Sequence, residues 1–266
     1  DSSLRLSGIE ATGGATLSYK IRQTARSLTE AYGDVSFRKV WLDAGSADLA
    51  PEVANSDFDQ FGLSAGLRHS WQAAPALGPT SAILSFGMGY VAGAQVTDWR
   101  AIELRQVVFQ SDRRSLGLTL AARADDRLDN AINSATSRRI GATYQQGLAG
   151  GQTLTFQISA NDVNSDSALV WKDEAAVSFS IGRIRLGPIE TAAGLDAAIA
   201  DYPGWILTPG GRRDVSGGLS LEVTYGAISV LGFSPTVVLS ARRTESNIDV
   251  FDRQSLSVGF SFSSNF

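Results

Sequence analysis

The sequence predicts an all-β chain, a transmembrane antiparallel up-and-down β-barrel of about fourteen strands with both termini on one side of the membrane. Three observations predict this fold. Apolar residues alternate with small polar residues along most of the chain, which is the period of a β-strand. The alternating runs are about 10 residues long, the length that a tilted strand needs to cross a bilayer. No stretch of about 20 apolar residues, the length of a membrane-spanning helix, occurs.

The strand candidates follow one another from the first residues to the last. Runs in which apolar residues hold every second position include 17–21, 61–67, 84–90, 102–104, 116–120, 154–158, 177–181, 219–225 and 256–262. The weakest candidates are the first, near residues 4–9, and the eleventh, near 189–199. Turn signals separate the runs, for example Gly13-Gly14, Asp125-Asp126 and Gly187-Pro188. Fourteen strands over 266 residues leave 19 residues for each strand and its connection.

A soluble β-sandwich is the alternative, because its strands also carry one apolar face. Sandwich strands are nearer five or six residues long, whereas the runs here are longer and even in number. The polar parity of these runs is rich in glycine, serine and threonine and poor in lysine and glutamate. These features favour the barrel, whose apolar face meets lipid and whose polar face lines a lumen. The overall hydrophobic fraction of 43% is unremarkable because alternation averages the two faces.

The connections fall into two sets. If odd-numbered strands run outward from a periplasmic N-terminus, the outer connections lie at 43–57, 125–134, 161–168, 201–210 and 244–252. These are long and acidic, whereas the opposite connections are short and lie near 73–79, 110–113, 147–151 and 226–232. Bacterial outer-membrane barrels have short periplasmic turns and longer outer loops. We therefore expect one integral outer-membrane domain over residues 1–266, in contact with the lipid bilayer and lipopolysaccharide.

The last strand candidate has the cleanest alternation. One parity holds Leu256, Val258, Phe260, Phe262 and Phe266, and the other holds serine and glycine. A terminal strand of this kind that ends in phenylalanine is the signal by which the outer-membrane insertion machinery recognises its clients. The alternative is an ordinary terminal strand whose last residue is aromatic. The other features favour the insertion signal.

The composition excludes several kinds of chemistry. The chain has no cysteine, so it has neither a disulfide framework nor a thiolate site, and one histidine cannot form a multi-histidine metal site. The net charge of −4 shows no basic footprint for nucleic acid. His69 lies on the apolar parity, as expected for a residue at the membrane interface, and the carboxylate pairs Asp125-Asp126 and Asp173-Glu174 are expected to be solvated. Aromatic residues near the predicted strand ends, among them Trp99, are expected to form interfacial belts, with stacking on sugars as the alternative. We therefore expect no catalytic residues, metal or cofactor, and no enzyme.

Three motifs occur within roughly the last 55 residues. Arg212-Arg213-Asp214 opens a strand, Gly232-Phe233-Ser234-Pro235 precedes the penultimate strand, and Ser246-Asn247-Ile248 leads to the closing strand. In this order they resemble the C-terminal barrel of the surface lipoprotein assembly modifier (Slam) family. The resemblance implies a fourteen-stranded barrel that moves lipoproteins or related proteins to the cell surface, with a client lipoprotein or periplasmic partner.

Members of the Slam family usually carry a periplasmic tetratricopeptide-repeat region before the barrel. Residues 1–266 contain no repeat of that period. The three motifs can also be explained by turn chemistry and barrel closure, because Pro235 suits a strand start and Asn247 can bond nearby backbone. Both interpretations remain open from the sequence.

The polar parity supplies the candidates for function. The charged and amide side chains expected to face the lumen are Lys20, Arg22, Arg68, Glu103, Arg105, Arg123, Arg139, Gln157 and Glu222. Fixed charge in a lumen tunes the selectivity of a pore, while the same groups can pair and brace the wall. The sequence thus allows a Slam-like translocator, a passive porin-like channel for ions or small solutes, or a structural barrel that anchors a partner complex.

Overall fold

The computed structural model describes residues 8–42, 55–72, 77–205, 208, 210–226 and 233–264. The strands are β1 (Gly8–Gln23), β2 (Ser27–Leu42), β3 (Gln60–Trp71), β4 (Thr80–Val91), β5 (Ala94–Gln110), β6 (Arg114–Arg127), β7 (Ala135–Gly147), β8 (Thr153–Ser165), β9 (Lys172–Leu186), β10 (Ile189–Tyr202), β11 (Arg212–Tyr225), β12 (Phe233–Ser246) and β13 (Arg253–Ser264). Three short 3-10 turns, η1 (Asn55–Phe58), η2 (Ala131–Asn133) and η3 (Asp249–Phe251), lie in connections. Within these ranges, no helix has the length and apolar character to span a membrane.

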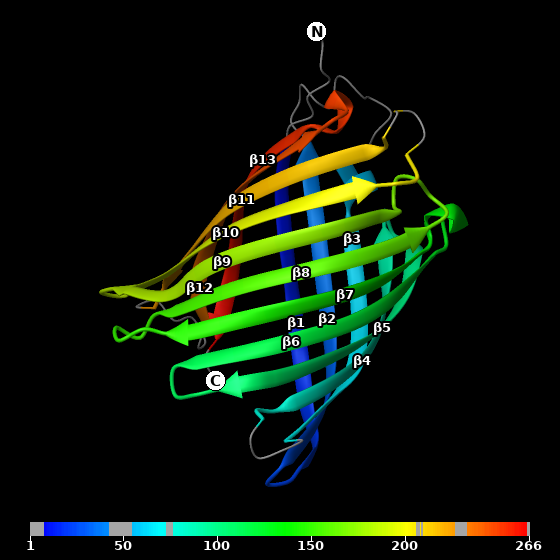
Figure 1. The fold of residues 1–266 in the computed structure, drawn as a ribbon. Helices are drawn as coiled ribbons and strands as arrows, with labels where there is room; N and C mark the ends of the chain where they lie inside the picture. The colour runs from blue at the N-terminus through cyan, green and yellow to red at the C-terminus, as the bar shows by residue number, and fades with distance from the viewer. Residues whose placement is uncertain are drawn as a thin grey trace.

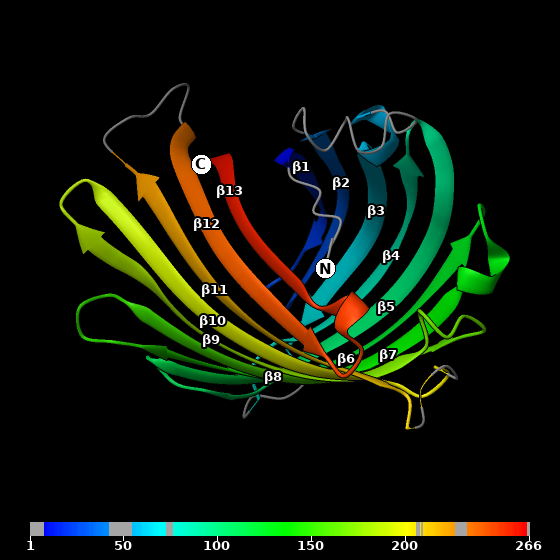
Figure 2. The same cartoon turned by 90° about the horizontal axis from the view of Figure 1, so that it is seen from above.

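The described strands form one sheet in which each strand is antiparallel to the next in the chain. Figures 1 and 2 show the sheet curving round on itself, with β1 (blue) and β13 (red) as its two edges. Cα atoms of these edge strands come within 8 Å of each other. No hydrogen-bonded ladder joins them in the described part of the chain. The fold is therefore the predicted antiparallel up-and-down barrel wall, with an unladdered seam between β1 and β13.

The strand count differs from the prediction at the start of the chain. Gly13 and Gly14, predicted as a turn, lie inside β1 and pair with Phe37 and Ser36 of β2. A Cβ on Gly13 would collide with the ring of Phe37, so this glycine provides space for the ring. Residues 4–7 of the predicted first strand, near 4–9, lie outside the described residues, and thirteen strands rather than fourteen are described.

The odd number of described strands changes the placing of their ends. In an antiparallel succession of thirteen, β1 and β13 run in the same direction. Gly8, where β1 begins, and Ser264, where β13 ends, therefore lie at opposite ends of the sheet. This corrects, for the described strands, the expectation that both ends of the barrel lie on one side.

The large apolar side chains lie on the outward face of the sheet and are exposed. Leu17 is 79% exposed and Leu256 is 81% exposed. Cross-strand pairing places Leu67, Leu84 and Ile102 side by side on this face. Among the described residues, the buried hydrophobic ones are confined to Ile83, Val163, Ala200 and Tyr202. A sandwich would bury its apolar face in a core, so the structure rules out that alternative.

The two ends of the sheet carry the two predicted sets of connections. One end, called here the long-loop end, holds the connections 43–59, 92–93, 128–134, 166–171, 203–211 and 247–252. The other, the short-turn end, holds 24–26, 72–79, 111–113, 148–152, 187–188 and 226–232. All five predicted outer connections fall at the long-loop end, which confirms how they were grouped. The sequence assigned Asp125 and Asp126 to a connection, and this was wrong, because β6 continues through them to Arg127.

Candidate functional site

A row of inward-facing side chains crosses the wall from β1 to β8. Residues paired across antiparallel strands place their side chains on the same face. Successive cross-strand pairs link, in order, Lys20, Glu30, Arg68, Ile83, Glu103, Ala121, Arg139 and Asn161. The charges of this row alternate over Lys20, Glu30 and Arg68. The neutral Ile83 then lies before Glu103, and the small Ala121 lies between Glu103 and Arg139. The row lies on the face opposite to the exposed apolar one and defines the lumen side.

A cavity of about 690 Å³ opens on this lumen side. Five of the nine predicted lumen residues line it, and they come from strands β3, β5, β6 and β7. They are Arg68, Glu103, Arg105, Arg123 and Arg139. Its floor includes the small residues Ser85, Ala101, Ala121 and Ser137. The cavity exists because these small side chains stand between the long charged ones.

Glu103 is the central acid of the cavity. Arg105 donates from Nε to Glu103 Oε1, and Arg139 donates from Nη2 to Glu103 Oε2 across 3.3 Å. Arg105 and Glu103 lie two residues apart on β5, so their side chains share the inward face. Arg139 reaches Glu103 over Ala121, whose small side chain separates them in the row. Two guanidinium groups therefore share a single carboxylate.

The other two arginines of the cavity each have their own acidic partner. Arg123 makes a bidentate contact with Asp125, with Nε 2.8 Å from Oδ2 and Nη2 2.5 Å from Oδ1, and lies 4.4 Å from the centre of the Trp99 ring. Arg68 lies 3.9 Å from Glu30 and 5.7 Å from the centre of the Tyr32 ring. These contacts hold both guanidinium groups against the wall.

The cavity also contains residues that the sequence did not assign to the lumen. Tyr32, Asp34, Ile83 and Trp99 line it. Asp34 accepts hydrogen bonds from Thr16 (2.6 Å) and Ser64 (3.1 Å). The sequence predicted Trp99 in an interfacial aromatic belt, but its pairing with Gly87 and Asp125 places it on the inward face. Counting every second residue back from Glu103 along 94–110 would have placed Trp99 on the inward face.

The remaining predicted lumen residues lie apart from the cavity lining. Lys20, Gln157 and Glu222 have inward register positions on β1, β8 and β11. Arg22 is a correction: the register shifts between Lys20 and Arg22, and Arg22 pairs with Thr29. Thr29 in turn pairs with His69 on the outward face. The one-residue irregularity therefore moves Arg22 off the inward row.

Two of the three Slam-like motifs, residues 212–214 and 246–248, lie together at the long-loop end of β11 and β12, whereas Phe233 and Pro235 lie at the start of β12, at the short-turn end. Arg212 donates two hydrogen bonds to Asp214, from Nε (2.9 Å) and Nη2 (2.5 Å). Both side chains are almost completely buried, at 5% and 6% exposure. The Arg212 guanidinium lies 4.2 Å from the centre of the Tyr202 ring and 3.5 Å from that of Phe251. The Trp205 ring meets Phe251 edge-on at 5.0 Å.

Asn247 joins the two loops beside this pair. Its Oδ1 accepts from the backbone N–H of Arg213 (2.8 Å) and its Nδ2 donates to the carbonyl of Gly211 (3.0 Å). The Ile248 N–H donates to Ser246 Oγ (3.2 Å). Phe233 and Pro235 belong to β12, and Gly232 lies outside the described residues. The motifs at 212–214 and 246–248 thus form a structural clamp between two loops.

The structure describes part of the alternating C-terminal segment. Leu256 and Val258 are exposed on the outward face. Phe260 and Phe262 belong to β13, and Phe266 lies outside the described residues. Whether these residues signal insertion remains a prediction.

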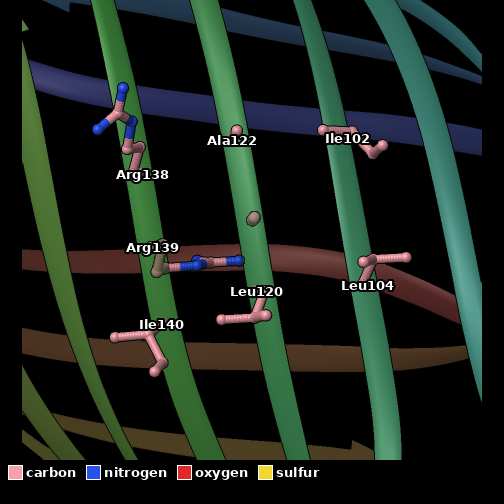
Figure 3. A pocket seen from close by; sticks show the side chains of 8 residues that line it. Ile102, Leu104, Leu120, Ala122, Arg138, Arg139 and Ile140 are labelled. Carbon is pink, nitrogen blue, oxygen red and sulfur yellow. The ribbon is translucent and has the colours of Figure 1, made fainter.

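A second, shallow pocket of about 380 Å³ lies on the outward face. Figure 3 shows Ile102, Leu104, Leu120 and Ile140 around Ala122, which leaves a hollow between larger neighbours. The consecutive residues Arg138 and Arg139 face opposite sides of the wall at this point. Arg138 pairs with Ala122 on the outward face, and Arg139 pairs with Ala121 on the inward face.

No catalytic arrangement is found among the described residues. His69 Nδ1 bonds Thr29 Oγ1 at 2.8 Å, and its ring stacks on Trp71 at 5.3 Å. Glu174 bonds Lys172. At the long-loop end, hydrogen bonds from Arg127 hold the pKa of Asp129 below its usual value. The described part of the chain contains no cluster of three or more histidine or acidic residues that could hold a metal ion.

Comparison with known proteins gives structural likenesses at low sequence identity. No protein-family model matches the chain, and neither does any curated protein. A loop-deletion mutant of OmpT, described as an outer membrane protein of Vibrio cholerae, is 7% identical with a TM-score of 0.46, over 97% of this chain and 99% of that one.

Two further solved structures are similar over comparable lengths. OccK10 (OpdN) of Pseudomonas aeruginosa is 10% identical with a TM-score of 0.41, over 98% of this chain and 100% of that one. OccAB3 of Acinetobacter baumannii is 8% identical with a TM-score of 0.44, over 94% and 92%. These values are too low to support an argument, so the fold assignment rests on the strand pairing of the chain itself, and the Slam resemblance on the C-terminal motifs.

Proposed function

We propose that this protein is an integral barrel of the bacterial outer membrane that acts as a passive channel for small polar solutes. The exposed apolar face supports the location, because a sheet with such residues outside and polar residues inside suits lipid on one side and water on the other. The grouping of connections supports an outer side at the long-loop end. Outer-membrane barrels have short turns on the periplasmic side and longer loops on the outer side, as the two sets of connections do here.

The observation that carries the proposal is the charged cavity on the lumen side. A wall built only for anchoring has no need to keep partly exposed arginines around a hollow of about 690 Å³. Fixed charges lining a water-filled passage set which solutes pass. The hydroxyl of Thr29 and the ring of His69 are in contact on the outward face, away from the cavity, and the proposal involves no chemical step.

Single-channel recording tests the proposal directly. The full chain, refolded in detergent, would be added to a planar bilayer in potassium chloride. We expect discrete conductance steps that are absent when detergent alone is added. Refolded protein that inserts into the bilayer and gives no conductance above background would refute the channel.

Protein translocation of the Slam type is a second candidate, favoured by the contact between two of the three C-terminal motifs. Arg212, Asp214, Ser246 and Asn247 lie at one site that ties two long-loop-end connections together. Deleting the gene should then leave a client lipoprotein in the periplasm. Unchanged surface exposure of every lipoprotein in the mutant would refute this role and leave the channel untouched.

A further inference from the structure

We propose that the lumen cavity binds small solutes that carry carboxylate or phosphate groups, through the guanidinium groups of Arg105 and Arg139, with Arg123 and Arg68 beside them. This inference rests on the proposed channel function and names the class of solute. The net charge of the cavity does not identify the class of solute, because each arginine has an acidic partner. The class of solute depends on which member of each pair is exposed to it.

In every pair of the cavity the arginine is more exposed than the acid. The side chains of Arg105 and Arg139 are 57% and 48% exposed, and the Glu103 that they share is 16% exposed. Arg68 is 45% exposed against 18% for Glu30. The carboxylates therefore lie beneath the guanidinium groups, and the surface presented to a solute is cationic.

The arginines retain donors for a ligand. A guanidinium group has five N–H donors. Arg105 and Arg139 each make one of the described hydrogen bonds to Glu103, through Nε and Nη2 respectively. The remaining N–H groups can form the bidentate, charge-assisted bonds that carboxylate and phosphate oxygens accept.

The rest of the lining is compatible with a bound anion. Ser85 and Ser137 contribute hydroxyl groups, and Ala101 and Ala121 leave space between the arginines. The fourth acid near the lining, Asp34, already accepts hydrogen bonds from Thr16 and Ser64. The ring of Trp99 holds the Arg123 guanidinium at 4.4 Å, so that group is positioned before a ligand arrives.

Two substitutions in one contact have opposite expected effects. In Arg139→Gln one exposed cation is lost, and we expect citrate binding to weaken about tenfold, which is the effect of losing one charge-assisted hydrogen bond. In Glu103→Gln the covered acid is lost while both arginines remain, and citrate should bind more tightly. A bracing role alone would not give effects of opposite sign.

Arg138→Gln is the matched control. It removes the same charge from the neighbouring residue, but Arg138 faces outward (Figure 3). Calorimetric titration of the detergent-solubilised protein with citrate, and separately with inorganic phosphate, measures binding whether or not the protein conducts. We expect the wild type and Arg138→Gln to bind alike, and phosphate to compete with citrate.

Channel recordings then separate the two proposals. We expect chloride to permeate in preference to potassium, with the preference reduced in Arg139→Gln and increased in Glu103→Gln. A conducting protein that prefers potassium, or that shows no citrate binding by calorimetry, would overturn the anion site and leave the channel standing. A protein that binds citrate through Arg139 but does not conduct would retain the site and refute the channel.

Discussion

Replacing Arg212 by methionine tests whether the buried clamp at the long-loop end stabilises the barrel. The side chains of Arg212 and Asp214 are 5% and 6% exposed and share two hydrogen bonds. Removing one partner of a buried pair leaves an uncompensated charge and costs about 3–5 kcal/mol. The guanidinium also contacts the rings of Tyr202 and Phe251, at about 0.5–2 kcal/mol for a cation–π contact. Methionine fills part of the volume, so we expect a net loss of about 3–5 kcal/mol.

The assay is equilibrium unfolding by guanidinium chloride in detergent, followed by tryptophan fluorescence. Trp205 packs against Phe251 in the same cluster and reports on it locally. Arg213→Gln is the matched control, because the adjacent Arg213 pairs with Asp201 at 65% and 47% exposure, and such surface pairs are worth about 0–1 kcal/mol. A loss in Arg212→Met no larger than that in Arg213→Gln would refute the reasoning. The double variant Arg212→Met/Asp214→Leu should recover much of the loss, since no buried charge remains.

Two further predictions concern the two faces of the wall. Leu120→Lys, near the middle of β6 on the outward face, should lower the free energy of unfolding in lipid vesicles by about 2–4 kcal/mol. The control Thr119→Lys, on the inward face, should cost much less. Equal losses would contradict the assignment of faces. Gly87→Ala should cost about 1–3 kcal/mol, because its Cβ would lie 2.6 Å from the Leu63 carbonyl oxygen and from the Trp99 ring. Gly117→Ala, whose nearest neighbour would be 3.8 Å away, should be close to neutral, and thermal unfolding of both variants would show whether it is.

Alternation was sufficient to predict the architecture because the two faces of the wall meet such different surroundings. The apolar parity of 61–67, 84–90 and 102–104 is the outward face, and the predicted outer connections do fall at one end. Gly13-Gly14 resembled a turn, but β1 requires a glycine where the Phe37 ring crosses it. The composition of a glycine pair cannot distinguish these two uses.

The cavity was predicted only in part, because parity gives a side chain's face but not its neighbours. The inward arginines were identified from alternation, yet the contact of Arg139 with Glu103 depends on the register of the three consecutive strands β5, β6 and β7. Arg22 was misplaced because an irregularity of one residue reverses the parity that follows. Trp99 was misplaced because a bulky aromatic residue is equally at home in a membrane belt or beside an arginine.

The seam between β1 and β13 determines where the wall can yield. Every other described strand is held by a ladder on both sides, whereas these two have one ladder each. Because they run in the same direction, any bonds between them would be the slanted bonds of a parallel pair, which are weaker for each residue. Amide protons that face this line should exchange with solvent before those of β5 to β8. Fluctuations of the barrel's cross-section should therefore concentrate at this seam, whereas the spacing of the cavity arginines on β3 to β7 is fixed by continuous ladders.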